Sequence, residues 1–309
     1  MQGDEFWIKF RGVRGGYATP GPTTVKYGGN TTCLEVHAGP HFFIIDGGTG
    51  LIGLGQEIMA AQHATGQPIN LPLLLTHVHN DHIQGLPLFQ PALCPHCRLY
   101  VFGPEPISGE NLEETLQRIM RPPLSPISQQ DILSKRTFTH ITHGARVILS
   151  DAEKPPRHVE ASDKKAEIAP ENVVIDTHHS YAHPQHGVLV FRVAYQGRSF
   201  VFATDVEGYI GGDRRLIRFA RHADLLIHDA EYDEHEYADG TVVKQGWGHS
   251  TWRMATDVAQ AAQVGRLILT HHSPLHDDAY LDEMEKKAQA VFPKTHMAQE
   301  GKVVDVNAT

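Results

Sequence analysis

The stretch Thr76-His77-Val78-His79-Asn80-Asp81-His82 places three imidazoles and one carboxylate close together in the chain. It directly follows the apolar run 71–75, which is typical of a buried strand. Imidazole and carboxylate groups are common ligands of zinc and related metals. So many donors at the end of one strand predict a metal site, and a histidine-rich surface loop is the structural alternative.

Composition narrows the class of protein. The 309 residues hold 27 Lys and Arg against 36 Asp and Glu, and the net charge of -9 argues against broad attraction to a polyanion. Three Cys are too few to cross-link a fold of this size, which favours a reducing compartment. Neither a signal-peptide pattern at the N-terminus nor an apolar run of membrane-spanning length is present. We therefore expect a soluble, cytoplasmic protein without membrane attachment.

Short apolar runs bounded by turn residues predict a series of strands. These strands cover 6–10, 33–37, 41–45, 71–75, 98–102, 173–175, 188–194, 199–203, 224–227 and 266–269. Helical spacing predicts helices from Gly50 through Ile58, over 111–120, over 251–263 with an end at Gly265, and over 281–291. No linker is visible, so one domain over 1–309 is expected, with a substrate-selecting insertion at about 104–165.

The histidine loop predicts two metal ions rather than one. His77 and His79 are two residues apart on an extended backbone and point the same way, whereas Asp81 and His82 lie past the strand end. Two-metal hydrolases hold their ions about 3.5–4 Å apart. Four ligands cannot satisfy two ions, and three later donors also lie next to apolar strands: His183, Asp205 and His271. From spacing alone the choice stays open, because other imidazoles lie nearby: His178, His179, His186 and His272.

The order of these motifs resembles a known family. His77-x-His79-x-Asp81-His82, then His183-Pro184, Thr204-Asp205 and Thr270-His271 resemble the metallo-β-lactamase superfamily. Within it, the chain is most similar to the phosphodiesterase branch that includes ribonuclease Z and bacterial cyclic-nucleotide phosphodiesterases. The resemblance implies an α/β (α+β) fold, an αββα sandwich of two mixed sheets flanked by helices, with the site at one edge of the sheets.

The resemblance also implies the ligand set. His77, His79 and His183 would hold one divalent ion, Asp81, His82 and His271 would hold the other, and Asp205 would bridge them. Zinc is the first choice for both ions because imidazoles dominate the set, and manganese and iron are the alternatives because carboxylates share it.

A second pair of segments matches the same branch. His228-Asp229-Ala230-Glu231 and His249-Ser250-Thr251 resemble the segments whose carboxylate and imidazole pass a proton in ribonuclease Z-like enzymes. Asp229 stands where that pattern carries a glutamate, so the shorter side chain is a departure. The structural alternative is that Ser250 or Thr251 caps the following helix, and both roles can hold together.

Three weaker features remain. Arg14 and Asn30 lie in glycine-rich loops and are candidate phosphate contacts, although tight turns explain these loops equally well. Cys94 and Cys97 have the C-x-x-C spacing of zinc or redox sites. No second cysteine pair exists to complete a zinc site, so we expect a surface turn with two reduced thiols.

These features predict a dinuclear metal-dependent phosphodiesterase that hydrolyses a small cyclic nucleotide, such as 3′,5′-cyclic AMP or GMP, with a metal-bridging hydroxide. Asp81, Asp229 and His249 are the candidate catalytic residues. The alternative is tRNA 3′-end processing, which the acidic chain and the absence of a basic glycine-rich arm disfavour. A noncatalytic metal-binding sensor is a further alternative, but all seven ligand positions are filled. The expected partner is a small phosphodiester rather than extended nucleic acid, and a homodimer is compatible with the sequence.

Overall fold

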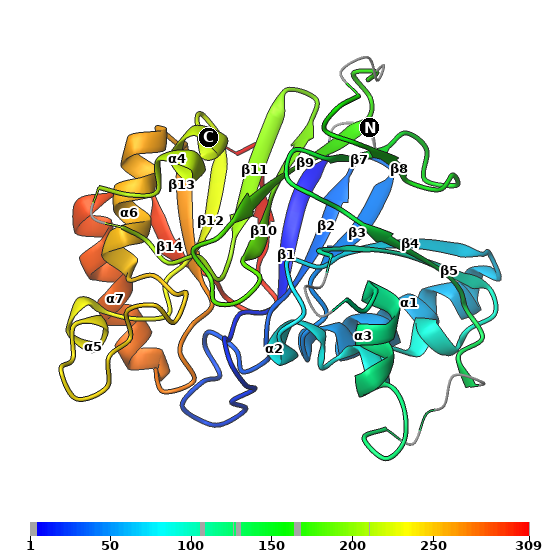
Figure 1. The fold of residues 1–309 in the computed structure, drawn as a ribbon, viewed down its shortest axis with the longest axis horizontal. Coiled ribbons are helices and arrows are strands. Elements are labelled where there is room, and N and C mark those ends of the chain that lie inside the picture. The colour runs from blue at the N-terminus through cyan, green and yellow to red at the C-terminus, as the bar shows by residue number, and fades with distance from the viewer. Residues whose placement is uncertain are drawn as a thin grey trace.

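The computed structural model describes residues 5–105, 109–125, 127, 131–163, 168–209 and 211–308. Its strands form two sheets (Figure 1). The first sheet contains, in spatial order, β15 (Val303–Asp305), β1 (Phe6–Gly12), β2 (Cys33–Ala38), β3 (His41–Ile45), β4 (Ile69–Leu74), β5 (Cys97–Gly103) and β6 (Lys135–His140). The second contains β14 (Thr295–Met297), β13 (Arg266–Thr270), β12 (Leu225–Asp229), β11 (Arg198–Ala203), β10 (Val188–Tyr195), β9 (Val173–Ser180), β7 (Arg146–Leu149) and β8 (Arg157–Val159).

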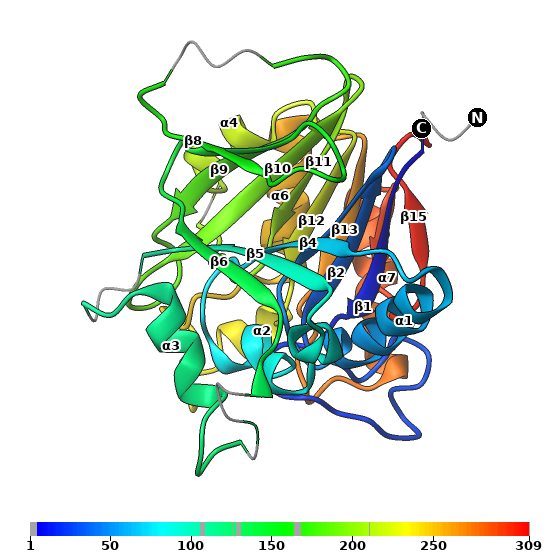
Figure 2. The same ribbon diagram turned by 90° about the vertical axis from the view of Figure 1, so that its right-hand side faces the viewer.

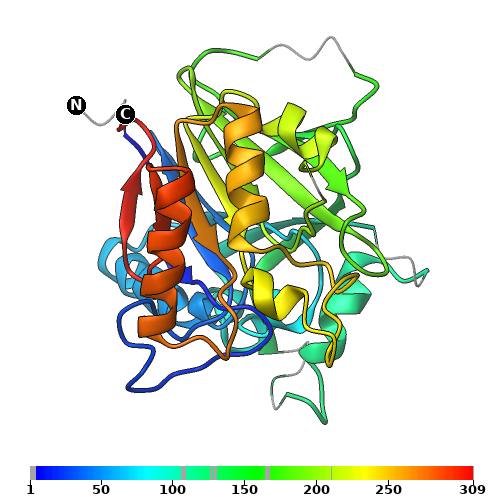
Figure 3. The same cartoon turned by 90° about the vertical axis from the view of Figure 1, so that its left-hand side faces the viewer.

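Helices cover the outer face of each sheet. On the first sheet these are α1 (Gly50–Thr65), the short α2 (Asn80–Ile83) and α3 (Leu112–Ile119), which Figure 2 shows on the same side of the molecule. On the second sheet they are α4 (Arg214–Ala220), α6 (Trp252–Ala262) and α7 (Asp278–Val291), and Figure 3 shows α6 and α7 side by side across it. The remaining helices are α5 (Glu234–Tyr237) and two 3₁₀ turns at Leu86–Leu88 and Gln90–Leu93. In the described residues no helix is long and apolar enough to cross a membrane.

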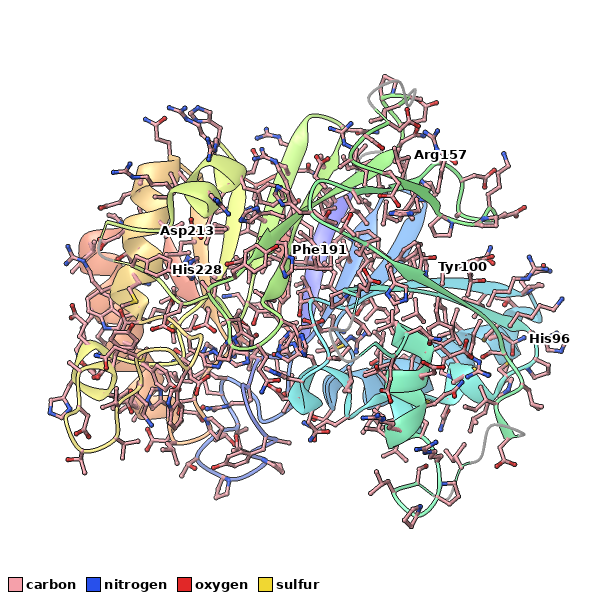
Figure 4. The ribbon with its side chains drawn as sticks, viewed as in Figure 1. His96, Tyr100, Arg157, Phe191, Asp213 and His228 are labelled. Carbon is pink, nitrogen blue, oxygen red and sulfur yellow. The ribbon has the colours of Figure 1, made fainter. Side chains whose placement is uncertain are left out.

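The two sheets are held together by aromatic and branched side chains. In β1 alternate residues are buried, so Phe6, Ile8 and Phe10 all face the second sheet. There they meet residues such as Phe191, which lies near the centre of the molecule in Figure 4. Burial of one such side chain contributes about 1.5–3 kcal/mol to stability. Two further apolar clusters lie under the helices, which completes the αββα sandwich that the sequence predicts.

The direction of the strands fixes where a site can form. In the first sheet β3, β4, β5 and β6 run parallel, and in the second β11, β12, β13 and β14 do. In such sheets, ligand sites form in the loops beyond the carboxyl ends of the parallel strands. The predicted metal donors after β4, β11 and β13 therefore meet at one edge of the sandwich.

Two sequence predictions need correction. Helix α6 ends at Ala262 and not at Gly265, because Gln263 adopts the left-handed conformation (φ 53°) and ends the helix. The segment 104–165 is only partly an insertion, since β6 extends the first sheet and β7 and β8 extend the second. Of this segment, residues 106–108, 126, 128–130 and 164–165 lie outside the described residues. Its role in substrate selection stays a prediction.

Candidate metal centre

The seven predicted donors come from loops and strand ends of both sheets. His77 and His79 follow β4, and Asp81 and His82 lie on α2. The second half of the chain contributes three more donors: His183 between β9 and β10, Asp205 after β11, and His271 after β13. All seven lie at the edge where the parallel strands end.

The first group of donors contains His77, His79 and His183, whose ligand atoms lie within 4.8 Å of one another. His183 Nε2 is 2.9 Å from His79 Nδ1. The other ring nitrogen of His183, Nδ1, is 3.2 Å from the carbonyl oxygen of Gly248. A hydrogen bond there fixes the orientation of the ring and leaves Nε2 free to bind a cation.

The second group contains Asp81, His82, Asp205 and His271, all buried and again within 4.8 Å of one another. His271 Nε2 is 3.2 Å from Asp81 Oδ2 and 3.3 Å from Asp205 Oδ1. His82 Nε2 is 3.3 Å from Asp81 Oδ2 and 3.1 Å from Asp205 Oδ2. The sequence places these four residues on three separate segments, and the fold brings their ligand atoms together.

Asp205 lies between the two groups. Its Oδ1 is 3.7 Å from His77 Nε2 and 3.9 Å from His183 Nε2, while its Oδ2 faces His82. Oδ1 is also 3.3 Å from His271 Nε2, so Oδ1 faces both groups and Oδ2 faces the second group. This is the placement that a bridging ligand requires, and the bridging role itself stays a prediction.

The residues of both groups fit divalent cations. Within the described residues, His77 Nε2 and His82 Nε2 are buried without a hydrogen-bond partner, although Asp205 oxygens lie nearby. These two nitrogens therefore face the other donors without a hydrogen bond of their own. Buried polar atoms without partners are rare and need an explanation, which coordination to a cation provides. Five imidazoles and two carboxylates suit zinc, manganese or iron.

The charges of the second group are strongly coupled. Burial opposes charge on His82, but the Asp205 and Asp81 carboxylates outweigh burial and hold the pKa of His82 well above its usual value. Burial likewise acts to raise the pKa of Asp205, yet the nearby His271 and His82 hold it well below its usual value. The group is thus built to keep its carboxylates ionised next to positive charge.

The backbone at three site residues is unusual. Asp46, Asp205 and His271 follow β3, β11 and β13, and all have a left-handed conformation, with φ of 62°, 54° and 61°. This conformation costs energy in residues with a side chain and clusters at functional sites. Here it turns the chain sharply after each strand, so the side chain faces the site.

Asp46 is a site residue that the sequence analysis missed. It is fully buried, and its Oδ2 is 2.9 Å from His82 Nδ1. Its Oδ1 accepts a hydrogen bond from the Thr76 backbone N–H at 2.8 Å. It therefore fixes the ring of His82 from behind, as carboxylates often do for metal-binding histidines. An aspartate directly after the apolar strand β3 is the same signal that pointed to Asp205.

Asp229 and His249 lie beside the second group. Asp229 Oδ2 is 2.9 Å from His249 Nδ1, and Asp229 Oδ1 accepts a hydrogen bond from the Ser250 backbone N–H at 2.8 Å. Burial lowers the pKa of His249, but Asp229 outweighs it and raises the pKa to about 9. The His249 ring stacks on His271 with 4.8 Å between ring centroids. The structure thus brings together the pair that the sequence proposes as a proton relay.

Two further features complete this side of the site. Glu231, which the sequence analysis did not single out, places Oε2 3.1 Å from His271 Nδ1 and 3.3 Å from His249 Nδ1. Thr251 caps α6, since its side chain accepts a hydrogen bond from Met254 N. The capping alternative and the juxtaposition of Asp229 with His249 therefore occur together.

The N-terminal glycine loop also reaches the site, in a way that corrects one prediction. Arg14 is fully buried and donates to the carbonyl oxygens of Gly28, Ser273 and His276, so it ties loops together and does not face a ligand. Asn30 is also engaged, because its Nδ2 donates to Glu300 Oε1.

The same loop touches two of the predicted ligands. Gly16 N donates to Asp81 Oδ2 at 2.8 Å. A Cβ on Gly15 would lie 2.2 Å from a carbon of the His271 ring, so only glycine allows this approach.

Cys94 and Cys97 flank an exposed turn at Pro95 and His96, as expected, but the cysteine side chains themselves are not on the surface. Both thiols are free and buried, because Cys97 begins β5 and Cys94 packs with Met59 under α1. Burial raises the pKa of Cys97 to about 12. In Figure 4 neighbouring His96 lies at the right-hand edge of the molecule, away from the second sheet. These cysteines do not belong to the metal centre.

Comparison with known proteins agrees with this fold. The metallo-β-lactamase fold protein YhfI from Bacillus subtilis matches with a TM-score of 0.65 and 19% identity, over 98% of this chain and 100% of YhfI. The short form of human tRNase Z matches with a TM-score of 0.60 and 20% identity, over 98% of this chain and 100% of that protein. At these identities the likeness concerns the fold alone.

Sequence relatives define the family. The model of the β-lactamase superfamily domain matches residues 41–272. The ribonuclease Z of Enterococcus faecalis is 27% identical over 266 residues, which cover 76% of this chain and 79% of the relative. The ribonuclease Z of Lactococcus lactis is 33% identical over 123 residues, which cover 35% of this chain and only 38% of the relative. The chain belongs to the metallo-β-lactamase superfamily, and it is similar over part or most of its length to relatives named ribonuclease Z.

Proposed function

We propose that the protein is a metal-dependent phosphodiesterase that cleaves RNA near its 3′ end, as an endoribonuclease of the tRNA-processing kind. The proposal rests on a seven-donor centre with Asp229 and His249 beside it, in a chain whose relatives are named ribonuclease Z. It departs from the cyclic-nucleotide substrate that the sequence favoured. The relatives support RNA instead, and the net charge of the whole chain says little about one local surface.

Exposed aromatic side chains around the site support a nucleotide substrate. Tyr181, Tyr209 and Trp247 are 72%, 57% and 49% exposed and lie on three loops close to the donors. Glu207 joins these loops: it accepts hydrogen bonds from Gly246 N and Gly248 N, and its own N–H donates to Ala182 O. Bases of single-stranded nucleic acid stack on such rings, each stack contributing about 1–3 kcal/mol.

The chemistry divides between bound cations and the protein's own groups. Two divalent cations at these donors would neutralise charge on a phosphodiester and supply a nucleophile from water at neutral pH. His249 holds a proton for the leaving oxygen, and Asp229 orients its ring through Nδ1, which leaves Nε2 as the donating atom. Backbone N–H groups hold Asp229 in place, with Ser250 N at 2.8 Å and Asp205 N at 3.1 Å.

A substrate panel tests the proposal. Zinc- and manganese-loaded protein is incubated with a tRNA that carries a 3′ extension, with short RNAs and with cyclic AMP and cyclic GMP. The expected result is endonucleolytic cleavage of the extended tRNA at one position. Hydrolysis of a cyclic mononucleotide together with intact RNA would overturn the proposal in favour of the small-diester function that the acidic composition favours.

A noncatalytic metal sensor is the remaining alternative. All seven donors are present and converge, which such a protein would not need for one weakly held ion. Bis(p-nitrophenyl) phosphate provides the test, because it requires no recognition beyond a phosphodiester. Failure of the metal-loaded protein to hydrolyse it, together with every other substrate of the panel, would establish the sensor.

A further inference from the structure

A cluster of basic side chains lies outside the metal centre. Four arginines occur within eight residues on and directly after α4: Arg214, Arg215, Arg218 and Arg221. Leu216 and Ala220 anchor this helix on the second sheet, and all four arginines are exposed. In a chain with a net charge of -9, this is a local concentration of positive charge.

Two of these arginines line a cavity of about 570 Å³ between α4 and the strands β7 and β9. Figure 2 shows α4 close to β9, and the rings of Phe219 on α4 and His178 on β9 lie 5.3 Å apart. The cavity is lined by Arg215 and Arg218 from the helix and by Arg146 and Arg192 from the sheet. Among its lining residues Asp176 is the one carboxylate, and Arg146 Nε already binds it at 2.6 Å. The cavity therefore carries an excess of positive charge.

The basic side chains that line this cavity differ in how many hydrogen bonds and ion pairs they already form. Arg192 has a structural role, since it donates to the carbonyl oxygens of Phe219 and Arg221 at 2.9 and 3.0 Å. Arg215 and Arg218, by contrast, form no ion pair within the described part of the chain. His178 also lines the cavity; it is 4% exposed, and its Nε2 is buried without a hydrogen-bond partner. This nitrogen has no protein partner within the described residues, so a water or a ligand group has to satisfy it.

If only α4 is considered, its arginines are simply explained as solvated surface side chains. That explanation does not account for a concave site where arginines of the helix and of the sheet converge over a buried imidazole without a partner. Guanidinium groups present paired N–H donors that match the oxygens of a phosphate. The chemistry of the cavity therefore fits a phosphate group.

The cavity is also close to the metal centre along the chain. Strand β9 carries Asp176 and His178 at the cavity and ends at Ser180, three residues before His183. His178 and His183 are five residues apart, and five residues of extended chain span at most about 17 Å. An RNA whose cleaved bond lies at the metal centre reaches the cavity within a few nucleotides.

We propose that the cavity between α4 and β9 is a subsite that binds a backbone phosphate of the RNA substrate, a few nucleotides from the cleaved bond. This inference rests on the proposed function. Arg215 and Arg218 supply the contacts, and His178 forms the floor.

The test compares two double variants of the metal-loaded enzyme. Arg215→Ala/Arg218→Ala removes the two helix arginines of the cavity. Arg214→Ala/Arg221→Ala removes the same charge from the same helix outside the cavity. For each, kcat/KM is measured on 3′-extended tRNA as a function of NaCl concentration, and the Kd of the same labelled RNA is measured in parallel. Hydrolysis of bis(p-nitrophenyl) phosphate monitors the metal centre.

We expect the cavity variant to lose about tenfold or more in kcat/KM on RNA, with hydrolysis of the small diester unchanged. The slope of log kcat/KM against log salt should fall by about 0.7, the value for one phosphate contact on single-stranded RNA. The control variant should keep most of the activity and the wild-type slope. Equal losses in both variants, or none in the cavity variant, would overturn the inference.

Two outcomes separate this inference from the proposed function. If wild-type protein cleaves no RNA but the cavity variant alone loses affinity for it, the proposed function fails and the phosphate subsite stands. Inorganic phosphate is the second probe, titrated by calorimetry. Tight phosphate binding that only the cavity variant loses, with unchanged RNA kinetics, would make the cavity a site for a free anion and overturn the RNA subsite.

Discussion

Asp205 faces imidazoles of both groups: its Oδ1 is 3.7 Å from His77 and 3.3 Å from His271, and its Oδ2 is 3.1 Å from His82. We predict that Asp205→Ala loses metal from both groups and loses activity with it, because both groups then lose a carboxylate ligand and the negative charge that offsets the cations. Metal per chain is measured by inductively coupled plasma mass spectrometry after dialysis. Retention of two metals per chain would refute the bridging role.

The role proposed for His249 is to donate a proton to the leaving oxygen and not to hold a cation. We predict that His249→Ala keeps its metal content but slows turnover by roughly 10²- to 10⁴-fold, the usual contribution of a positioned proton donor. The loss should shrink on substrates with a good leaving group, such as p-nitrophenol, because that leaving group needs no proton. Unchanged rates on a substrate with a poor leaving group would remove the relay.

For single residues, the sequence predicted the proposed metal ligands but not the residues that hold those ligands in place. All seven proposed ligands meet at one edge, since each stands next to an apolar strand or in the histidine loop. Asp46 and Glu231 were missed because they act through other residues: one holds His82, the other His271 and His249. Such contacts depend on which loops meet in space, which one sequence does not specify.

Among the elements, long apolar strands were predictable and short ones were not. Strands β10, β11 and β13 carry continuous apolar runs and appear where expected. Strands β14 and β15 have three residues each and are formed by pairing with neighbours, not by their own pattern. Helix α4 escaped notice because only Leu216 and Ala220 of its residues are buried.

The contact between β9 and α4 predicts a dependence of stability on pH. His178 is buried against Phe219, near His143 and Arg215, and burial lowers its pKa to about 4. The unfolded chain binds the proton with a pKa near 6.5, so between these values the unfolded state holds more protons and stability falls as pH falls. At pH 5 this contribution amounts to about 2 kcal/mol relative to pH 8.

The variant His178→Gln should therefore lose less stability than wild type between pH 8 and pH 5. The free energy of unfolding is measured by urea denaturation at both pH values. His63→Gln, at an exposed position of α1, is the matched control and should behave as wild type. The same pH dependence in wild type and His178→Gln would show that His178 is not the responsible group.

For the whole molecule, bound metal should be a large source of stability. The donors come from both halves of the sandwich, so cations that bind only the folded chain stabilise it by mass action. At 100 times Kd this stabilisation is about 2.7 kcal/mol for each site. Chelation with EDTA should lower the melting temperature by about 5 °C or more in differential scanning calorimetry. In Asp205→Ala the same treatment should have little effect; an equal shift there would contradict the link to these donors.

Charge is also uneven at this scale. The chain is acidic as a whole, yet α4 and the adjacent strands gather four arginines around one cavity. An average over all residues therefore favoured a small substrate, while the local distribution supports a longer one. The sequence contains every one of these arginines, but only the fold brings Arg146 and Arg192 next to Arg215 and Arg218.

The spread of the donors along the chain has a consequence for biosynthesis. His77, His79 and His183 are all made before the chain reaches Asp205, whereas the second group is complete only with His271. A nascent chain can therefore assemble at most one of the two groups until β13 and His271 leave the ribosome. The proposed phosphodiester chemistry uses both ions, so under the proposed function we expect an unfinished chain to leave the RNA around it intact.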